Sequence, residues 1–162
     1  MAMTPNGFIA KTDDDTSWIS AEEWNSYSSI TRNAGNLIVG HRTYDILTKQ
    51  PEFSELKDVK LVVVSTKEIK LLADNHLVAG SPKEALKSFE NAKEVIVAGG
   101  GNLNASFLAE DLVDEIYLDI EPIIFGNGIP LFQEKDFENR LIFLGMKNIT
   151  QNEVQLHYQV LK

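Results

Sequence analysis

The stretch Val95-Ile96-Val97-Ala98-Gly99-Gly100-Gly101-Asn102-Leu103 decides the fold class of this chain. A short apolar run, typical of a buried strand, leads into three consecutive glycines and then into a helical pattern. Because glycine has no Cβ, the backbone can turn sharply there, and the first N–H groups of the following helix are left unpaired. The stretch predicts either an anion-binding turn or a bare strand-to-helix turn, since its spacing matches neither the G-x-G-x-x-G motif nor a P-loop.

Similar apolar runs recur along the rest of the chain and predict further strands. The middle runs are continuously apolar, as in parallel strands that are covered on both faces. The last run alternates with period two, as in an antiparallel strand. A mixed sheet is therefore expected, with strands at 37–39, 61–64, 76–79, 95–98, 116–120, 141–144 and 154–160.

Helix-start signals lie between these runs. Ser81-Pro82-Lys83-Glu84 and Ser20-Ala21-Glu22-Glu23 both have the form of a capping box. Further helices are predicted from Thr43 or Tyr44 to before Pro51, and over 104–112. The alternation of strands and helices predicts an α/β fold, a three-layer α/β/α sandwich with a mixed, mainly parallel central sheet, in one domain over residues 1–162.

Composition excludes several classes of function. The net charge is −9, which disfavours nucleic acid as a partner. No apolar run approaches the ~20 residues of a membrane span, so no membrane association is expected. The start of the chain lacks the features of a signal peptide and there is no cysteine, which indicates a cytoplasmic location. Only three histidines could supply nitrogen ligands, and no metal site is expected.

Polar residues follow three of the predicted strands at the point where each strand ends. Ligands of open α/β sheets bind outside the carboxyl ends of parallel strands. Each group alone is explained by a turn or by solvated surface charge, but together they offer a guanidinium, an ammonium, hydroxyls and two helix N-termini. These groups suit several phosphates of one elongated ligand, and the predicted cofactor residues are Gly40, His41, Arg42, Thr43, Ser65, Thr66, Lys67, Gly99, Gly100, Gly101, Asn102 and Leu103.

The order of these motifs resembles the dihydrofolate-reductase-like fold. Within that fold it resembles the reductase domain of riboflavin biosynthesis, the RibD C-terminal domain family, as a stand-alone member. The resemblance covers nearly the whole chain and rests on 6–10, 18–20, 39–44, 63–66, 98–101, 112–116 and Pro122-Ile123-Ile124-Phe125-Gly126-Asn127-Gly128-Ile129-Pro130-Leu131-Phe132.

The resemblance implies NADPH as cofactor, with its 2′-phosphate near Arg42 and the Ser65-Thr66 turn and its pyrophosphate over Gly99 to Leu103. It also implies a cis peptide at Gly99-Gly100 and a homodimer that uses 122–132 and the C-terminal strands. The implied activity is an NADPH-dependent reductase that transfers a hydride to a C=N or C=O of a small pterin- or pyrimidine-like molecule. A catalytically inactive nucleotide-binding or interaction module, and a flavin-binding domain, are the alternatives.

Four residues are candidates for the substrate side. Counting from Trp18 as in folate reductases places the catalytic acid at Glu23, although Glu23 is also the third residue of a capping box and Glu22 competes with it. Trp18 could stack on a heterocycle or belong to the core. Asp119 and Glu121 could bind a heterocycle edge, or lie on an exposed strand face and at a solvated strand end.

Two features depart from the family pattern. The Asp-Asp-Pro run associated with the substrate's ribose phosphate is absent, because the chain reads Arg42-Thr43-Tyr44-Asp45-Ile46-Leu47. A phosphoribosyl substrate is therefore not expected. The apolar strand that precedes the Asn-Gly turn in relatives is represented only by Met1-Ala2-Met3. We expect either a start further upstream or a sheet that is completed in another way.

Overall fold

A computed structural model describes all 162 residues, and its centre is a parallel sheet. The sheet consists of β3 (Asn36–Gly40), β4 (Lys60–Val64) and β5 (His76–Ala79), in that order. Both pairs of neighbouring strands are parallel, and Ile38 lies opposite Val62. These two side chains are completely buried, as the continuously apolar runs predict.

The segment 95–98, predicted as a strand, runs parallel to β3 but forms only a single bridge with it, between Ile38 and Val97. Its contacts to β3 are Ile38 N–H to Ile96 O (2.8 Å), Ala98 N–H to Ile38 O (3.0 Å) and Gly40 N–H to Gly99 O (2.7 Å). The Ile96 N–H instead donates to the Asn36 side chain. The ladder is therefore too short for a regular strand, yet it fixes Gly99 beside Gly40.

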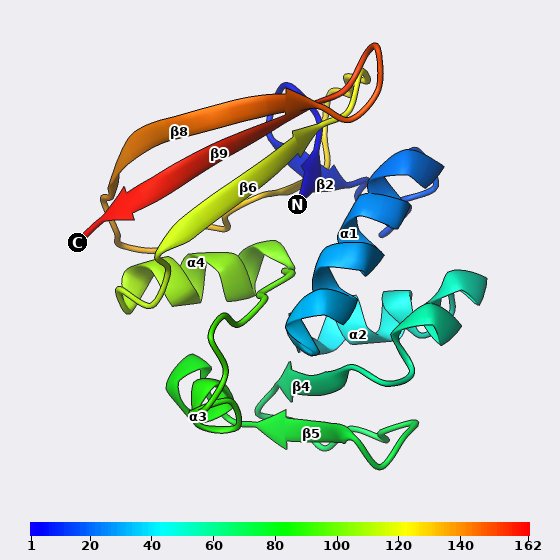
Figure 1. Cartoon of the computed structure of the whole chain (residues 1–162), viewed down its shortest axis with the longest axis vertical. Coiled ribbons are helices and arrows are strands. Elements are labelled where there is room, and N and C mark those ends of the chain that lie inside the picture. The colour runs from blue at the N-terminus through cyan, green and yellow to red at the C-terminus, as the bar shows by residue number, and fades with distance from the viewer.

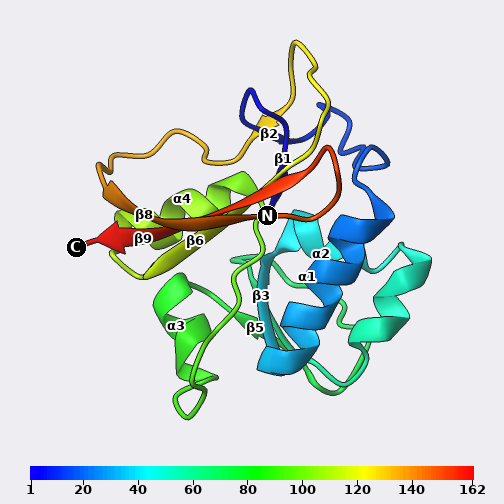
Figure 2. The ribbon, with the colours of Figure 1, turned by 45° about the horizontal axis from the view of Figure 1, so that its top comes forward.

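A second sheet has the order β1–β6–β9–β8 and lies at the opposite end of the molecule from β3–β5 (Figures 1 and 2). Its strands are β1 (Ala2–Met3), β6 (Glu115–Ile120), β9 (Val154–Leu161) and β8 (Arg140–Asn148), and β6–β9 and β8–β9 are antiparallel. The prediction of a mixed sheet is confirmed. The short stretch Met1-Ala2-Met3 before the Asn-Gly turn contains β1, which pairs in parallel with β6 and joins this sheet. A small antiparallel pair joins β2 (Phe8–Ala10) to β7 (Ile129–Pro130).

The helices are α1 (Ala21–Ala34), α2 (His41–Leu47), α3 (Pro82–Lys87) and α4 (Gly101–Ala109), with a 3₁₀ helix η1 (Pro51–Leu56). Two predicted starts were too late, because α2 and α4 begin directly after Gly40 and Gly100 without a capping side chain. A sequence search for capping residues could not find such starts. The 3₁₀ helix was not predicted.

Alternation along β3 divides the core into two clusters, one on each face of the parallel sheet. Leu37 and Val39 face Tyr44 of α2, with Trp24 of α1 packed against them, whereas Ile38 faces Phe107 of α4 and the α3 side. Helices thus cover both faces, and the predicted three-layer arrangement is confirmed. None of the helices is both long and apolar enough to cross a bilayer.

Candidate active site

A cleft of about 1160 Å³ opens where β3, β4 and the 95–98 segment end. Ligand pockets are ordinarily about 300–1,000 Å³, so this cleft is large enough for a ligand of more than drug size. One side is formed by the strand ends and the turns that follow them, which we call the strand-end wall. The facing side is formed by residues of α1, η1 and the last turn of α2, which we call the helical wall.

The strand-end wall contains nearly all residues that the sequence predicted for a cofactor. Gly99 is the exception, because it is buried behind the wall and its carbonyl accepts the Gly40 N–H. The others come from three separate strand ends, and the fold brings them together around one cleft. They are Gly40, His41, Arg42, Thr43, Ser65, Thr66, Lys67, Gly100, Gly101, Asn102 and Leu103.

The glycine turn presents backbone donors to the cleft. Gly99 has φ +83° and the Gly99-Gly100 peptide is cis, as the family resemblance implied. Helix α4 then begins at Gly101 with no side-chain cap, so the N–H groups of its first turn are free to bind a ligand. A Cβ on Gly101 would lie 2.3 Å from the Pro130 carbonyl oxygen, which explains why only glycine fits there.

Arg42 and Lys67 are the only lysine or arginine side chains that line the cleft. Arg42 Nε lies 2.6 Å from Asp14 Oδ1 and donates to Asp14 Oδ2 at 2.7 Å, while 62% of the Arg42 side chain remains exposed. Lys67 makes no ion pair, and its main-chain N–H donates to the Ser65 hydroxyl in a tight turn. An anionic ligand at the strand-end wall can therefore reach both cations, but at Arg42 it competes with Asp14.

The helical wall has the opposite charge. Glu23 of α1 and Glu52 and Glu55 of η1 line it, and no lysine or arginine does. The Glu23 residue is only 6% exposed, and no side-chain hydrogen bond to its carboxyl group is present. Burial raises the pKa of Glu23 to about 7, and the neighbouring charges of Asp119, Glu121 and Glu153 act in the same direction against the nearby α-amino group. At neutral pH the Glu23 carboxyl is therefore poised to hold or release a proton.

The predicted capping box at α1 is only half formed. Ser20 Oγ accepts the Glu23 N–H at 3.0 Å, as predicted. The reciprocal bond is different, because the Ser20 N–H donates to Glu121 Oε1 at 2.8 Å rather than to Glu23. The Glu23 side chain is consequently not used by the cap and is left at the cleft.

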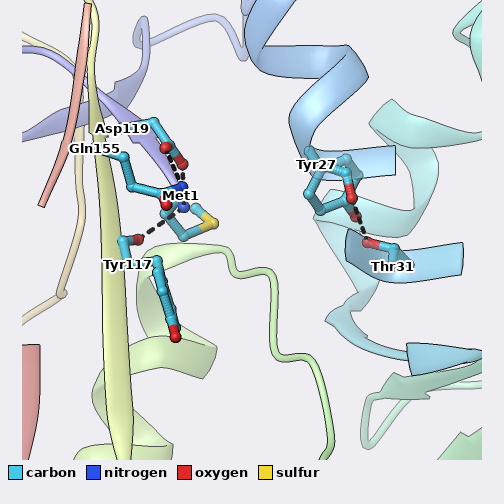
Figure 3. A network of polar contacts seen from close by, with 6 residues as sticks. All are labelled: Met1, Tyr27, Thr31, Tyr117, Asp119 and Gln155. Carbon is cyan, nitrogen blue, oxygen red and sulfur yellow. Dashed lines mark hydrogen bonds and ion pairs between the residues drawn. The ribbon is translucent and has the colours of Figure 1, made fainter. Parts of the chain in front are cut away.

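Trp18, Asp119 and Glu121, the predicted substrate residues, are not among the residues that line the cleft. Trp18 packs edge-on against Phe125, with ring centroids 5.6 Å apart. Asp119 is buried and accepts hydrogen bonds from Gln155 Nε2 (2.7 Å) and the Met1 amino group (3.0 Å), as Figure 3 shows. Each of the three is engaged by a residue distant in sequence or by aromatic packing, which a local pattern does not reveal.

Two aromatic residues of the helical wall were not predicted as site residues. Trp24 and Tyr27 line the cleft beside Glu23, with ring centroids 5.5 Å apart. Figure 3 shows Tyr27 on α1, where its main-chain oxygen accepts the Thr31 hydroxyl. The Tyr27 hydroxyl itself has no partner, and burial raises the pKa of Tyr27 above its usual range. Helical spacing from Glu23 to Tyr27 is the sequence signal that could have placed them together.

A family model for the RibD C-terminal domain matches residues 1–156. This chain belongs to that family. The RibD C-terminal domain described here is similar to the uncharacterized protein YwjB of Bacillus subtilis (strain 168). The two are 30% identical over 167 residues, which cover 98% of this chain and 94% of YwjB.

Solved structures confirm the fold of this RibD C-terminal domain. A protein of Shewanella sp. PV-4 whose name refers to riboflavin biosynthesis superposes with a TM-score of 0.80 at 18% identity, covering 100% of this chain and 97% of that one. The diaminohydroxyphosphoribosylaminopyrimidine deaminase/5-amino-6-(5-phosphoribosylamino)uracil reductase of Thermotoga maritima gives 0.72 at 15% identity, covering 99% of this chain and 55% of that one. The fold is therefore reductase-like.

Proposed function

We propose that this chain is an NADPH-dependent reductase that transfers a hydride to a C=N or C=O carbon of a small pterin- or pyrimidine-like heterocycle. One observation carries the proposal. A single cleft joins an anion-binding wall, built from three strand ends, to a helical wall that holds a buried, protonatable carboxyl group. Membership of a reductase-domain family supports the same reading.

The chemistry of the strand-end wall fits NADPH. Arg42, Ser65 and Thr66 would hold the adenosine 2′-phosphate, since a guanidinium and hydroxyls are strong phosphate donors. The first turn of α4, from Gly101 to Leu103, would hold the pyrophosphate on unpaired N–H groups. When bound, NADPH supplies the hydride.

Glu23 would supply the proton that accompanies the hydride. Its carboxyl group retains a proton near neutral pH and lies in the cleft without a competing hydrogen bond. A positioned acid with a pKa near the working pH is the most effective proton donor. Trp24 and Tyr27 flank Glu23 with aromatic surface, which limits access of water to the reacting atoms.

The acidic character of the helical wall favours an uncharged or cationic substrate over an anionic one. Besides Glu23, which retains a proton near neutral pH, the carboxylates of Glu52 and Glu55 line this wall. The nearby cation Arg32 is already bonded to Glu55 at 2.8 Å. A substrate phosphate would meet repulsion there, and it would find no free lysine or arginine. This charge pattern agrees with the missing Asp-Asp-Pro run and disfavours the phosphoribosyl compound in the name of the Thermotoga maritima enzyme.

A turnover assay tests the proposal. It follows the loss of reduced-nicotinamide absorbance when NADPH is mixed with a panel of unphosphorylated pterins, pyrimidines and small carbonyl compounds. Glu23→Gln and Glu22→Gln serve as a matched pair, because these neighbours differ in whether they line the cleft. We expect oxidation with at least one compound, abolished in Glu23→Gln and retained in Glu22→Gln. Tight NADPH binding without turnover of any compound would instead favour the inactive nucleotide-binding module.

We also infer a homodimer that uses β8. Large apolar side chains are exposed on both faces of this edge strand, including Ile142, Phe143, Leu144 and Met146. An exposed apolar edge strand is a template for pairing with another chain. Light scattering should give a dimer mass for the wild type and a monomer mass for Phe143→Glu, with Lys147→Glu on the same strand as control. A monomeric wild type would contradict this inference.

A further inference from the structure

We infer that Glu121 is a positioning residue, which occupies the Glu position in the cap of α1 and thereby holds the Glu23 carboxyl group in the cleft. The inference rests on the proposed function of Glu23 and goes beyond it, because it assigns a role to a residue outside the cleft. The observation that carries it is the bond from Ser20 N–H to Glu121 Oε1, which joins residues 101 positions apart.

The local alternative is built into the sequence. In a capping box, the carboxylate three residues after the N-cap reaches back to the backbone N–H at the start of the helix. Glu23 is that residue, and its own N–H already bonds to Ser20 Oγ. Because the Ser20 N–H has one hydrogen, Glu121 and Glu23 compete for it. In the structure, Glu121 and not Glu23 accepts the hydrogen bond from the Ser20 N–H.

Helix α3 shows what the same motif does without such a competitor. Its Ser81 accepts the Glu84 N–H, as Ser20 does for Glu23. The Glu84 carboxylate, however, folds back and accepts the Gly80 N–H at 2.8 Å. Two copies of one motif in one chain therefore place the glutamate differently. Glu84 reaches the N–H one residue before its N-cap, whereas at α1 the equivalent Ile19 N–H is bonded to Thr16 O and the Ser20 N–H to Glu121.

Glu121 is itself held firmly at the end of β6. It is 3% exposed, its N–H donates to Met3 O, and its carbonyl accepts the Ile123 N–H. Glu153, 4% exposed, lies beside it at the entry to β9. Burial, and then the hydrogen bond to Glu153, raise the pKa of Glu121 to about 7. A glutamine at 121 can reproduce both contacts, accepting from Ser20 and donating to Glu153.

The charged and titratable groups around Glu23 come from every element packed against it. They are Tyr27 on α1, the Met1 amino group at the start of β1, Asp119 in β6, Glu121 after β6 and Glu153 before β9. A carboxylate that bonds to a backbone N–H has a lower pKa than one without such a bond. Return of Glu23 to the Ser20 N–H would therefore lower the pKa of Glu23.

The test compares Glu121→Met, which fills the volume without an acceptor, with Glu121→Gln, which keeps the acceptor. Glu84→Ala in α3 controls for loss of a cap remote from the cleft. In ligand-free protein, NMR follows the Ser20 amide and the ¹³C-labelled Glu23 carboxyl across pH. We expect Glu121→Met to keep a bonded Ser20 amide while the Glu23 titration moves down by about one unit or more. Glu84→Ala should match the wild type in the Glu23 titration. Glu121→Gln should lower the pKa of Glu23 less than Glu121→Met does, because it removes the charge of Glu121 but keeps the bond to Ser20.

An unchanged Glu23 titration in Glu121→Met would overturn the inference. So would equal behaviour of Glu121→Met and Glu121→Gln, since the charge of Glu121 rather than its cap bond would then be responsible. If Glu121→Met does not fold, Glu23→Gln must leave the Ser20 amide and its pH dependence as in wild type, because Glu121 and not Glu23 accepts that bond. A changed Ser20 amide in Glu23→Gln would overturn the inference. None of these readouts uses NADPH or a substrate, so failure of the proposed reductase activity is detected separately in the turnover assay.

Discussion

The two walls of the cleft differ in charge and in how the chain builds them. The strand-end wall carries Arg42, Lys67 and backbone donors, each next to the strand that places it. The helical wall carries Glu23 beside aromatic side chains, and its state depends on β1, β6 and β9 through residues far away in sequence. The comparison teaches that one wall follows from local sequence and the other from long-range packing. We propose that the first binds the cofactor and the second serves the substrate.

Removing the acid of the helical wall should give the largest effect. In Glu23→Gln, kcat should fall by roughly 100-fold or more, the usual contribution of a positioned general acid. NADPH affinity should stay within about two-fold of wild type, because Glu23 belongs to the other wall. Steady-state kinetics and calorimetric titration measure the two quantities. A large loss of NADPH affinity would erase the distinction between the walls.

Arg42→Ala is the corresponding change at the strand-end wall. Hydrogen bonds to a charged group contribute about 1.5–3 kcal/mol, so NADPH binding should weaken by about 10- to 100-fold. NADH, which lacks the 2′-phosphate, should be affected much less. Calorimetric titration with both cofactors checks this prediction, with Arg32→Ala on α1 as control. An equal loss of affinity for NADPH and NADH would mean that Arg42 does not contact the 2′-phosphate.

The pH dependence should separate the walls again. Glu23 binds a proton more tightly in the folded protein than at its ordinary pKa of 4.5, so the folded state holds more protons between 4.5 and about 7. Its contribution to stability is therefore present at low pH and is lost as pH rises through about 7. Thermal denaturation should show Glu23→Gln gaining stability over wild type at pH 8 and little at pH 4. The reverse order would contradict the raised pKa.

The smallest effect is expected at Asp14. Its ion pair with Arg42 is exposed, and such pairs contribute about 0–1 kcal/mol. Asp14→Asn frees Arg42 for a phosphate, so NADPH should bind up to about five-fold more tightly while NADH binding is unchanged. Asp13→Asn on the same loop is the matched control. Weaker NADPH binding would mean that Asp14 orients Arg42 rather than competing for it.

The strand-end wall could be predicted from the sequence, whereas much of the helical wall could not. The strand ends, the glycine turn and the Ser20 and Ser81 caps were predictable, because each depends on residues within a few positions of one another. The replacement of Glu23 by Glu121 as acceptor of the Ser20 N–H was not predictable, because this bond joins the end of β6 to the start of α1. Asp119 and Trp18 were assigned to the substrate for the same reason, because their partners Gln155 and Phe125 are distant in sequence.

The most direct measurement is a calorimetric titration of the wild type, Arg42→Ala and Glu23→Gln with NADPH and with NADH. The account predicts saturable NADPH binding to the wild type that is stronger than NADH binding. Arg42→Ala should lose that preference, and Glu23→Gln should keep it. Absence of NADPH binding, or equal affinity for the two cofactors in the wild type, would contradict the proposal that the strand-end wall is an NADPH site.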